Sequence, residues 1–277
     1  CRYSGRATLY NTVLPVFYIA TDCFKTRSNK GRAGSGDAMK VIIVIIYSFL
    51  SFSGLAVAAG GYSLNKANID ATDAESLQRG AKIFADRCLS CHAATFMRYN
   101  RLADIGLSQG QIKQYFIADN SVKVGDTMKS AIDASTAKQM FGVIPPDLSV
   151  VSRSRGADWL YTYFISFYKD DATATGWNNS IFPNVAMPNV FPQEQGVLRA
   201  VYASEDKTSF NLEVETPGTL SPREFDDSML DLTNFLVFMG EPAAEKRKQI
   251  GSLVIIFLII FAFMAWAVKR EFWKDVH

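Results

Sequence analysis

Residues 88 to 92 read Cys88-Leu89-Ser90-Cys91-His92, which is the pattern Cys-x-x-Cys-His. On a helical turn, positions i, i+3 and i+4 share one face, so both thiols and the imidazole point the same way. This spacing lets two thiols reach the vinyl groups of one porphyrin while the imidazole reaches its iron. We therefore expect one covalently bound haem c, attached through Cys88 and Cys91, with His92 as an axial ligand of the iron.

The count of histidines restricts the second axial ligand. The chain of 277 residues has two, His92 and His277, and His277 lies at its far end. A zinc site built on the same motif would lack its fourth partner for this reason. The second ligand of a haem iron is then a methionine, an unusual group, or nothing. A His/Met pair closes the iron to substrates and suits electron transfer.

The methionines of the central part of the chain are Met97, Met128, Met140, Met187, Met229 and Met239. Met97 is close to His92 in sequence, and Met229 and Met239 fall in a predicted helix where they are expected to pack in the core. Met187 lies in the proline-bounded loop Phe182-Pro183-Asn184-Val185-Ala186-Met187-Pro188, which has no helical period. These positions favour Met187 and leave Met128 and Met140 open.

An export signal is predicted ahead of this region. Met39-Lys40 is followed by an apolar run over residues 41–52 and by small residues ending at Ala56-Val57-Ala58-Ala59. Residues 39–59 therefore have the layout of a signal peptide, the alternative being an anchor that is never cut. Residues 1–38 begin with Cys1 instead of Met and do not fit in front of such a signal, so we expect them to be a non-mature upstream segment.

A second apolar run follows the central region. Residues 250–268 form an uncharged run that is long enough to cross a bilayer as a helix. The alternative is a buried helix of a soluble protein. Both flanks are basic, so the positive-inside rule does not give the orientation. The signal peptide instead predicts an exported domain over residues 60–245, a transmembrane anchor over 250–268 and a cytoplasmic tail over 269–277.

Charge is unevenly distributed along the chain. Residues 59–245 hold 16 Lys and Arg against 23 Asp and Glu, whereas both ends are basic. An acidic domain argues against nucleic acid as its partner. Acids concentrate in residues 194–241, and the most prominent are Glu205, Asp206, Glu213, Glu215, Asp226 and Asp227. They either steer a basic protein partner or are ordinary solvated loop charges.

Helical patterns dominate the domain. Thr72 and Glu75 are spaced as a capping box, after which Leu77, Ala81 and Cys88 fall on one helical face. A second capping box at Ser221-Pro222-Arg223-Glu224 starts an apolar stripe that Gly240 and Pro242 end. We expect a third helix over 157–168 and irregular chain over 176–222, with a weak strand pattern at 211–215. The predicted class is a mainly α, cytochrome c-like haem domain with long irregular insertions and one C-terminal transmembrane helix.

Several further motifs carry a family resemblance. They are Arg79-Gly80, Tyr99-x-Arg101-Leu102, Pro145-Pro146-Asp147-Leu148-Ser149 with Arg153 and Arg155 after it, the Phe182-to-Pro188 loop, and residues 235–242 leading into the apolar run. With the Cys-x-x-Cys-His motif, the chain resembles the cytochrome c1 family, the haem subunits of ubiquinol–cytochrome c reductase.

The resemblance implies particular residues and partners. It implies Met187 as the sixth ligand of the iron, Pro145 and Pro146 as a wall against the haem, and Arg155 as the partner of a haem propionate. It also implies a redox subunit without acid, base or nucleophile of its own. Such a subunit takes electrons from the Rieske iron–sulfur protein and passes them to a soluble or membrane-bound cytochrome c. It is anchored beside cytochrome b in a bacterial inner membrane, with the haem domain on the periplasmic side.

Other functions share parts of this pattern. A different membrane-tethered c-type cytochrome would feed a terminal oxidase, and an open-site haem enzyme or gas sensor would leave the sixth position free. A structural anchor would use the haem only to hold the fold. The Pro145-to-Ser149 motif and the distant Met187 favour the reductase subunit over these alternatives.

Overall fold

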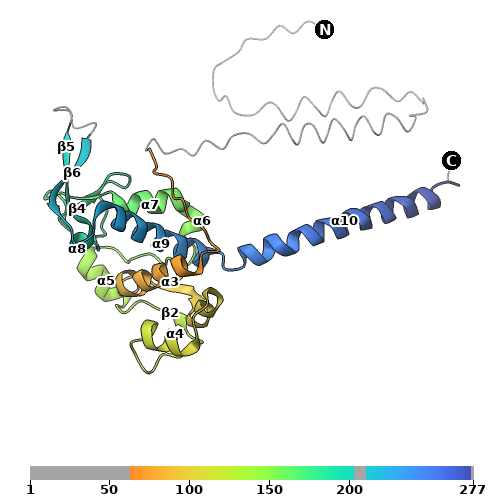
Figure 1. The fold of residues 1–277 in the computed structure, drawn as a ribbon, viewed down its shortest axis with the longest axis horizontal. Helices are drawn as coiled ribbons and strands as arrows, with labels where there is room; N and C mark the ends of the chain where they lie inside the picture. Colours follow the sequence, from red (N-terminus) through yellow and green to blue (C-terminus); the bar gives the residue numbers. More distant parts are fainter. Residues whose placement is uncertain (1–62, 203–209, 276–277) are drawn as a thin grey trace, which may run out of the picture. The chain divides into compact units, whose positions relative to one another are not determined.

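The computed structural model describes residues 63–202 and 210–275. The predicted upstream segment 1–38 and signal peptide 39–59 lie outside the described residues, as do Cys1, Cys23, Glu205, Asp206 and His277. The fold of the described part is mainly α, as predicted (Figure 1).

Short strands are interspersed among the helices along the chain (Figure 1). In order they are α3 (Ala74–Ile83), the π-helical turn η1 (Phe84–Cys88), β1 (Ala94–Arg98), the 3₁₀-helix η2 (Tyr99–Ile105), α4 (Gln109–Phe116), β2 (Thr127–Met128), α5 (Ala134–Phe141), α6 (Val151–Arg155), α7 (Ala157–Ile165), β3 (Phe167–Lys169), β4 (Trp177–Asn179), α8 (Pro192–Gln195), β5 (Gly196–Tyr202), β6 (Phe210–Pro217), α9 (Pro222–Gly240) and α10 (Ala244–Phe272).

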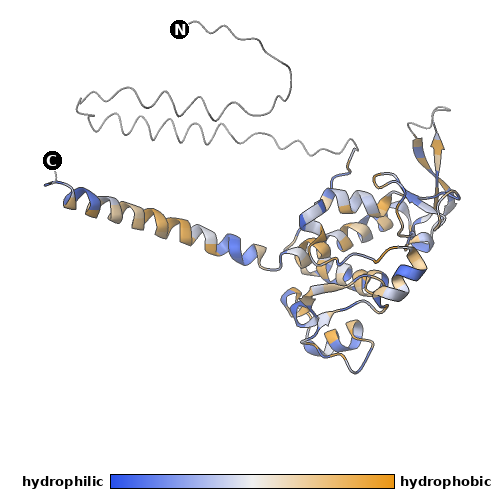
Figure 2. Cartoon of the chain, turned by 180° about the vertical axis from the view of Figure 1, so that it is seen from behind, coloured by the Kyte–Doolittle hydropathy of each residue, from blue (hydrophilic) through white to orange (hydrophobic). Residues whose placement is uncertain are grey.

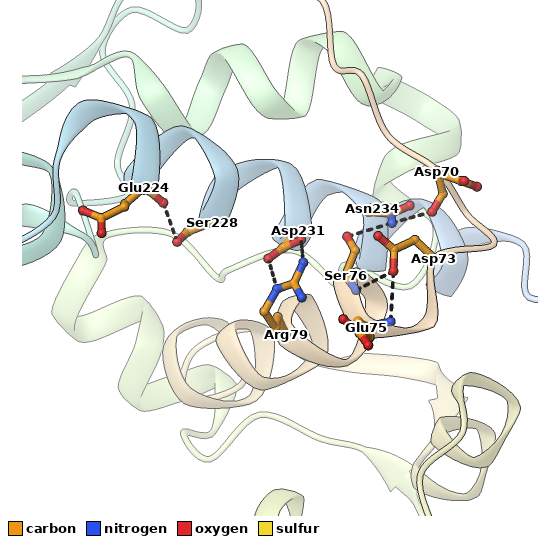
Figure 3. Close-up of polar contacts among 9 residues, drawn as sticks. All are labelled: Asp70, Asp73, Glu75, Ser76, Arg79, Glu224, Ser228, Asp231 and Asn234. Atoms are coloured by element: carbon orange, nitrogen blue, oxygen red, sulfur yellow. Dashed lines mark hydrogen bonds and ion pairs between the residues drawn. The ribbon is translucent and has the colours of Figure 1, made fainter.

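Helices α3 and α9 pack against each other at Gly80. A Cβ atom on Gly80 would lie 2.0 Å from the carbonyl oxygen of Asp231, so only glycine allows this approach. Beside the contact, the Arg79 guanidinium donates two hydrogen bonds, of 2.6 and 3.0 Å, to the Asp231 carboxylate (Figure 3). Further along, the rings of Phe84 and Phe235 lie 5.6 Å apart. The Arg79-Gly80 pair is therefore explained by this helix crossing.

The start of α3 differs from the prediction. The residue that caps the helix is Asp73, whose carboxylate accepts hydrogen bonds from the backbone N–H groups of Glu75 and Ser76 (Figure 3). Thr72 instead donates to the carboxylate of Asp70, in the turn before the helix. The predicted Thr72–Glu75 capping box is wrong, because the adjacent aspartate is an equally good cap one residue later.

The start and end of α9 agree with the prediction. Ser221 and Glu224 form a reciprocal capping box, and Pro222 occupies the first turn. The helix ends at Gly240, and its inner face buries Phe225, Met229, Leu232 and Leu236 in the core.

The predicted helix over 157–168 is shorter than expected. Helix α7 ends at Ile165, and the chain continues as strand β3, in which Phe167 and Tyr168 pair with Asn179 and Asn178 of β4. Large aromatic residues favour strands as well as buried helices, so the run of aromatics did not reveal the change.

Residues 176–222 are more regular than predicted. Strands β4, β3, β5 and β6 form one sheet in that order, in which β3 and β5 are parallel and the other neighbours are antiparallel. The β5–β6 pair runs from Gly196↔Pro217 to Tyr202↔Phe210. Val201, Tyr202 and Val214 are exposed on it, so the pair does not bury one continuous face. The alternating pattern that marks a half-buried strand is therefore weak in this sequence.

Helix α10 contains the predicted anchor. It spans Ala244–Phe272, and its most apolar window has a mean hydropathy of 2.7 with none of that window buried. Figure 2 shows the apolar middle of this helix between polar ends. By length and composition it is long and apolar enough to cross a membrane.

Candidate haem site

The local backbone around Cys88 forms two consecutive turns. In η1, the Leu89 N–H donates to the carbonyl of Phe84, five residues earlier, at 3.0 Å. The next turn closes through hydrogen bonds from the N–H groups of Cys91 and His92 to the carbonyl of Cys88, at 3.1 and 2.8 Å. Single π-helical turns are frequent at functional sites. The sequence predicted that a helix leads to Cys88 and brings it to the haem, but not that the last turn of this helix is π-helical.

A cavity of about 350 Å³ opens beside these turns. All the predicted site residues line it, namely Cys88, Cys91, His92, Pro145, Pro146, Arg155 and Met187. Most of the remaining wall is apolar, with side chains such as Val151, Trp159, Leu160, Phe164 and Phe182. A volume and lining of this kind are typical of pockets for organic cofactors.

The imidazole of His92 is held in one orientation. Its Nδ1 atom lies 2.8 Å from the carbonyl oxygen of Pro146, so Nδ1 carries a proton and donates to that carbonyl. The Nε2 atom is then free of a proton and can serve as a ligand. Burial lowers the pKa of His92, against smaller raising effects of the Pro146 carbonyl and of Asp147. The neutral imidazole is the form that binds a metal.

The chain after His92 is attached to the Pro145-to-Ser149 motif. Leu148 N–H donates to the carbonyl of Ala93 at 2.8 Å, and Phe96 N–H donates to the Ser149 hydroxyl at 3.0 Å. The Asp147 carboxylate accepts two hydrogen bonds from Thr95, one from its backbone N–H at 2.9 Å and one from its hydroxyl at 2.8 Å. The motif therefore fixes the strand that follows the Cys-x-x-Cys-His turn.

The thiols of Cys88 and Cys91 are both free in the structure. Cys88 is buried, and burial, with a smaller effect of Cys91, raises the pKa of its thiol to about 12. Cys91 is half-buried on the same cavity wall. The Cys91 sulfur accepts only a weak hydrogen bond of 3.7 Å from the adjacent Ser90 hydroxyl, and neither sulfur is in a disulfide, so both are available to a ligand in the cavity.

Met187 is set apart from the other methionines of the domain. Met97, Met128, Met229 and Met239 are buried in the core and Met140 is exposed. Among the described residues, Met187 is the only methionine that lines the cavity. The Tyr163 hydroxyl donates a hydrogen bond of 3.4 Å to its sulfur. The structure thus excludes Met128 and Met140 from the cavity wall, and these were the alternatives that the sequence left open.

Two asparagines shape the loop that carries Met187. The Asn179 side-chain oxygen accepts from the N–H groups of Ile181 and Phe182, at 3.1 and 3.2 Å. The Asn178 side-chain oxygen accepts from the N–H of Asn184, which has a φ of 59°. Asparagine tolerates this left-handed conformation better than most residues. The side-chain amides of these two buried asparagines therefore provide hydrogen bonds to backbone N–H groups of the loop, which has no regular backbone hydrogen bonding of its own.

Arg155 and Arg153 have different surroundings. The Arg155 guanidinium lines the cavity and lies 4.9 Å from the centre of the Trp159 ring and 5.8 Å from that of Phe182. Arg153 points elsewhere and lies 3.9 Å from the carboxylate of Glu241, just before α10. Arg155 is thus the one of the two that can meet an anionic group in the cavity.

Arg87 is a cavity residue that sequence reasoning missed. It lines the cavity and forms an ion pair with Glu194 of α8. Its position directly before Cys88 was the only signal in the sequence that could have indicated it.

The donor set of the cavity fits a haem group. It offers two uncommitted thiols, an imidazole with a free Nε2, a thioether, a guanidinium and an apolar wall, and a helix able to span a membrane follows the domain. These features define a membrane-anchored haem protein of the electron-transfer class.

Comparison with known proteins gives the family. The sequence model of the Cytochrome C1 family matches residues 64–276. The chain is 41% identical to the cytochrome c1 of Allochromatium vinosum over 86% of this chain and all of that protein. It is 43% identical to a protein of Nitrosomonas europaea named ammonia monooxygenase gamma subunit, with the same coverage. This chain belongs to the cytochrome c1 family.

A solved structure, a chain of a hyperthermophilic respiratory complex III, aligns over 88% of this chain and all of that chain with a TM-score of 0.41 and 14% identity. Family membership by itself identifies the protein as a haem-binding, membrane-associated component of electron transport.

Proposed function

We propose that this protein is the electron-transfer subunit of a quinol–cytochrome c reductase. It takes electrons from the Rieske iron–sulfur protein and passes them to a soluble or membrane-bound cytochrome c. The observation that carries the proposal is one cavity that gathers the Cys88-to-His92 motif and Met187 in a member of the cytochrome c1 family.

The chain's own residues would hold the haem in defined ways. Cys88 and Cys91 would attach the haem covalently through their sulfur atoms, and His92 and Met187 would be the ligands of its iron. Arg155 offers a charge-assisted partner for a propionate. When bound, the haem supplies reversible one-electron chemistry at its iron. With His92 and Met187 both bound to the iron, no position would be left for a substrate, and the largely apolar wall would complete a site suited to electron transfer.

The anchor and the signal sequence support a location. The haem domain is placed on the periplasmic side of a bacterial inner membrane, beside cytochrome b. Helix α10 crosses the membrane, and the short tail over residues 269–277 is cytoplasmic. Basic residues flank the apolar part of α10 on both sides, as expected where a helix leaves the bilayer.

A second assignment follows from the relative of Nitrosomonas europaea, whose name attaches it to ammonia monooxygenase. Under that assignment this chain would serve as a haem subunit of a monooxygenase. The residues that line the cavity do not distinguish the two assignments, because they fit a haem and do not identify the proteins that assemble with this chain. The relatives named cytochrome c1 favour the reductase.

Copurification tests the choice. The full-length, haem-loaded protein is extracted from membranes in mild detergent, and the proteins that accompany it are identified by mass spectrometry. We expect a cytochrome b and a Rieske protein, together with reduction of the haem by a quinol. Accompanying monooxygenase or oxidase subunits, without quinol-dependent haem reduction, would overturn the proposal.

A further inference from the structure

The Tyr163 hydroxyl faces the Met187 sulfur inside the cavity. The two atoms lie 3.4 Å apart, although the residues are 24 positions apart in sequence and come from different elements. Tyr163 is buried, with 8% of its surface exposed. A buried phenol normally finds a strong acceptor such as a carbonyl or carboxylate. Here its acceptor is a thioether, which is a weak one.

Aromatic contacts hold the Tyr163 ring in place. Trp159, one turn earlier on α7, stacks on it with ring centres 5.0 Å apart and an interplanar angle of 12°. Phe167 meets it edge-on at 4.9 Å, and Phe164 and Phe182 meet it at 5.8 and 6.4 Å. A ring enclosed on several sides cannot swing away, so its hydroxyl stays directed at Met187.

The loop that carries Met187 is also fixed to the same helix end. The Asn179 amide donates a hydrogen bond of 2.8 Å to the carbonyl of Tyr163. The Gln195 amide donates one of 2.9 Å to the carbonyl of Ile165. These carbonyls belong to the last turn of α7, where the regular backbone hydrogen bonds of the helix end, and the Tyr163 carbonyl otherwise accepts only a long bond of 3.4 Å from the Ser166 N–H. The segments before and after Met187 are thus both tied to the turn that presents Tyr163.

We propose that Tyr163 is a positioning residue that holds the Met187 sulfur as the axial ligand and tunes its donor strength. This inference rests on the proposed function, in which Met187 binds the haem iron. A thioether sulfur has two lone pairs, so one can bind iron while the other accepts the hydrogen bond of Tyr163. Accepting that bond withdraws electron density from the sulfur, which favours the reduced form of the site and raises its potential.

The test compares Tyr163→Phe with Tyr161→Phe in the full-length, haem-loaded protein. Tyr163→Phe keeps the ring and its packing and removes only the donor. Tyr161 lies on the same helix and is equally buried, but its hydroxyl interacts with Asp226 and it does not line the cavity. Both variants lose the hydroxyl group of one buried tyrosine, and only one of them loses the contact with Met187.

Two measurements report on the site itself. At a fixed solution potential, Tyr163→Phe lowers the ratio of reduced to oxidised haem about threefold, which is roughly 28 mV for a one-electron couple. It also raises the affinity of the oxidised protein for added imidazole about fivefold, because the sulfur is held less firmly. Tyr161→Phe leaves both quantities at the wild-type value. Wild-type potential and imidazole affinity in Tyr163→Phe would overturn the inference.

Met187→Leu separates this inference from the assignment on which it rests. If Met187 is the ligand, Met187→Leu changes the haem spectrum, and adding Tyr163→Phe to it causes no further change in potential. An unchanged spectrum in Met187→Leu would overturn the ligand assignment and this inference with it. A changed spectrum in Met187→Leu with a wild-type potential in Tyr163→Phe would overturn the inference alone.

Discussion

The imidazole Nδ1 of His92 donates to the carbonyl oxygen of Pro146 at 2.8 Å. This bond connects the Cys-x-x-Cys-His turn to a motif more than fifty residues later. The carbonyl belongs to the peptide just before Asp147, whose carboxylate also holds Thr95 and accepts from the Ser149 N–H at 2.8 Å. The orientation of His92 therefore depends on how firmly Asp147 fixes this segment.

Replacing Asp147 with asparagine should destabilise the domain. Burial raises the pKa of Asp147, but hydrogen bonds from Ser149 and Thr95 outweigh that effect and lower the pKa overall. A lowered folded-state pKa stabilises the fold above the unfolded value and loses this contribution as pH falls through the folded value. We expect Asp147→Asn to reduce the free energy of unfolding by about 1 kcal/mol near neutral pH, and the difference from wild type to shrink in acid.

Denaturant unfolding at several pH values, followed by haem absorbance, measures this effect. Asp119→Asn is the matched control, because Asp119 also has a lowered pKa but bonds only locally to Ser121. The control should leave the haem absorbance unchanged. Equal stability of Asp147→Asn and wild type at neutral pH would show that the carboxylate does not fix the segment.

Gly80→Ala should destabilise the crossing of α3 and α9. The added Cβ would lie 2.0 Å from the Asp231 carbonyl oxygen, which is backbone and cannot move aside. Overpacking of this kind costs about 1–3 kcal/mol, and the helices would have to separate near the Arg79–Asp231 pair. In α4, a Cβ on Gly110 would meet nothing within 4 Å, so Gly110→Ala should be neutral or slightly stabilising. Thermal unfolding of the two variants measures the contrast, and equal melting temperatures would contradict the prediction.

Much of the site could be read from the sequence because its motifs are short and chemically specific. The spacing of Cys88, Cys91 and His92 within one turn predicted that their side chains share one site. The capping box at Ser221 correctly predicted the start of α9. Met187 was favoured because its loop has no helical period, and the structure places it on the cavity wall. Its ligation of iron stays a prediction.

Other features depend on contacts that no local pattern records. The Tyr163–Met187 hydrogen bond joins side chains 24 positions apart, and the local sequence of η1 has no pattern that marks its π-helical turn. Strand β5 was missed because it pairs with β6 without burying one face. The capping error at Thr72 arose because Asp73 caps the helix one residue later, while the Thr72 hydroxyl bonds to Asp70. For Tyr163 and Met187 the deciding partner lies far away in sequence, whereas at Thr72 the sequence offers competing aspartates on both sides and does not rank them.

Replacing Met187 should open the iron. Met187→Leu keeps an apolar side chain of similar volume in the loop but removes the thioether, so we expect a changed haem spectrum, a lower midpoint potential and binding of carbon monoxide by the reduced protein. Met140→Leu is the control, since Met140 is 64% exposed and does not line the cavity. Rapid carbon monoxide binding by the wild-type protein would exclude a closed His/Met site.

The acidic stretch 194–241 gives a prediction about partner steering. Glu215 is paired with Arg199 at 2.7 Å and Asp226 is half-buried against Tyr161, so the exposed Glu213 and Asp227 are the described acids best placed to act at a distance. If they steer a basic cytochrome c, electron transfer to it falls steeply as salt increases. Glu213→Gln and Asp227→Asn should each slow the reaction about twofold at low salt and flatten its salt dependence.

Asp275→Asn is the control variant, because it removes the same charge in the proposed cytoplasmic tail and should have no effect on the rate. Stopped-flow rates at several ionic strengths measure this, and a flat response in the wild-type protein would show that these charges are ordinary solvated loop residues.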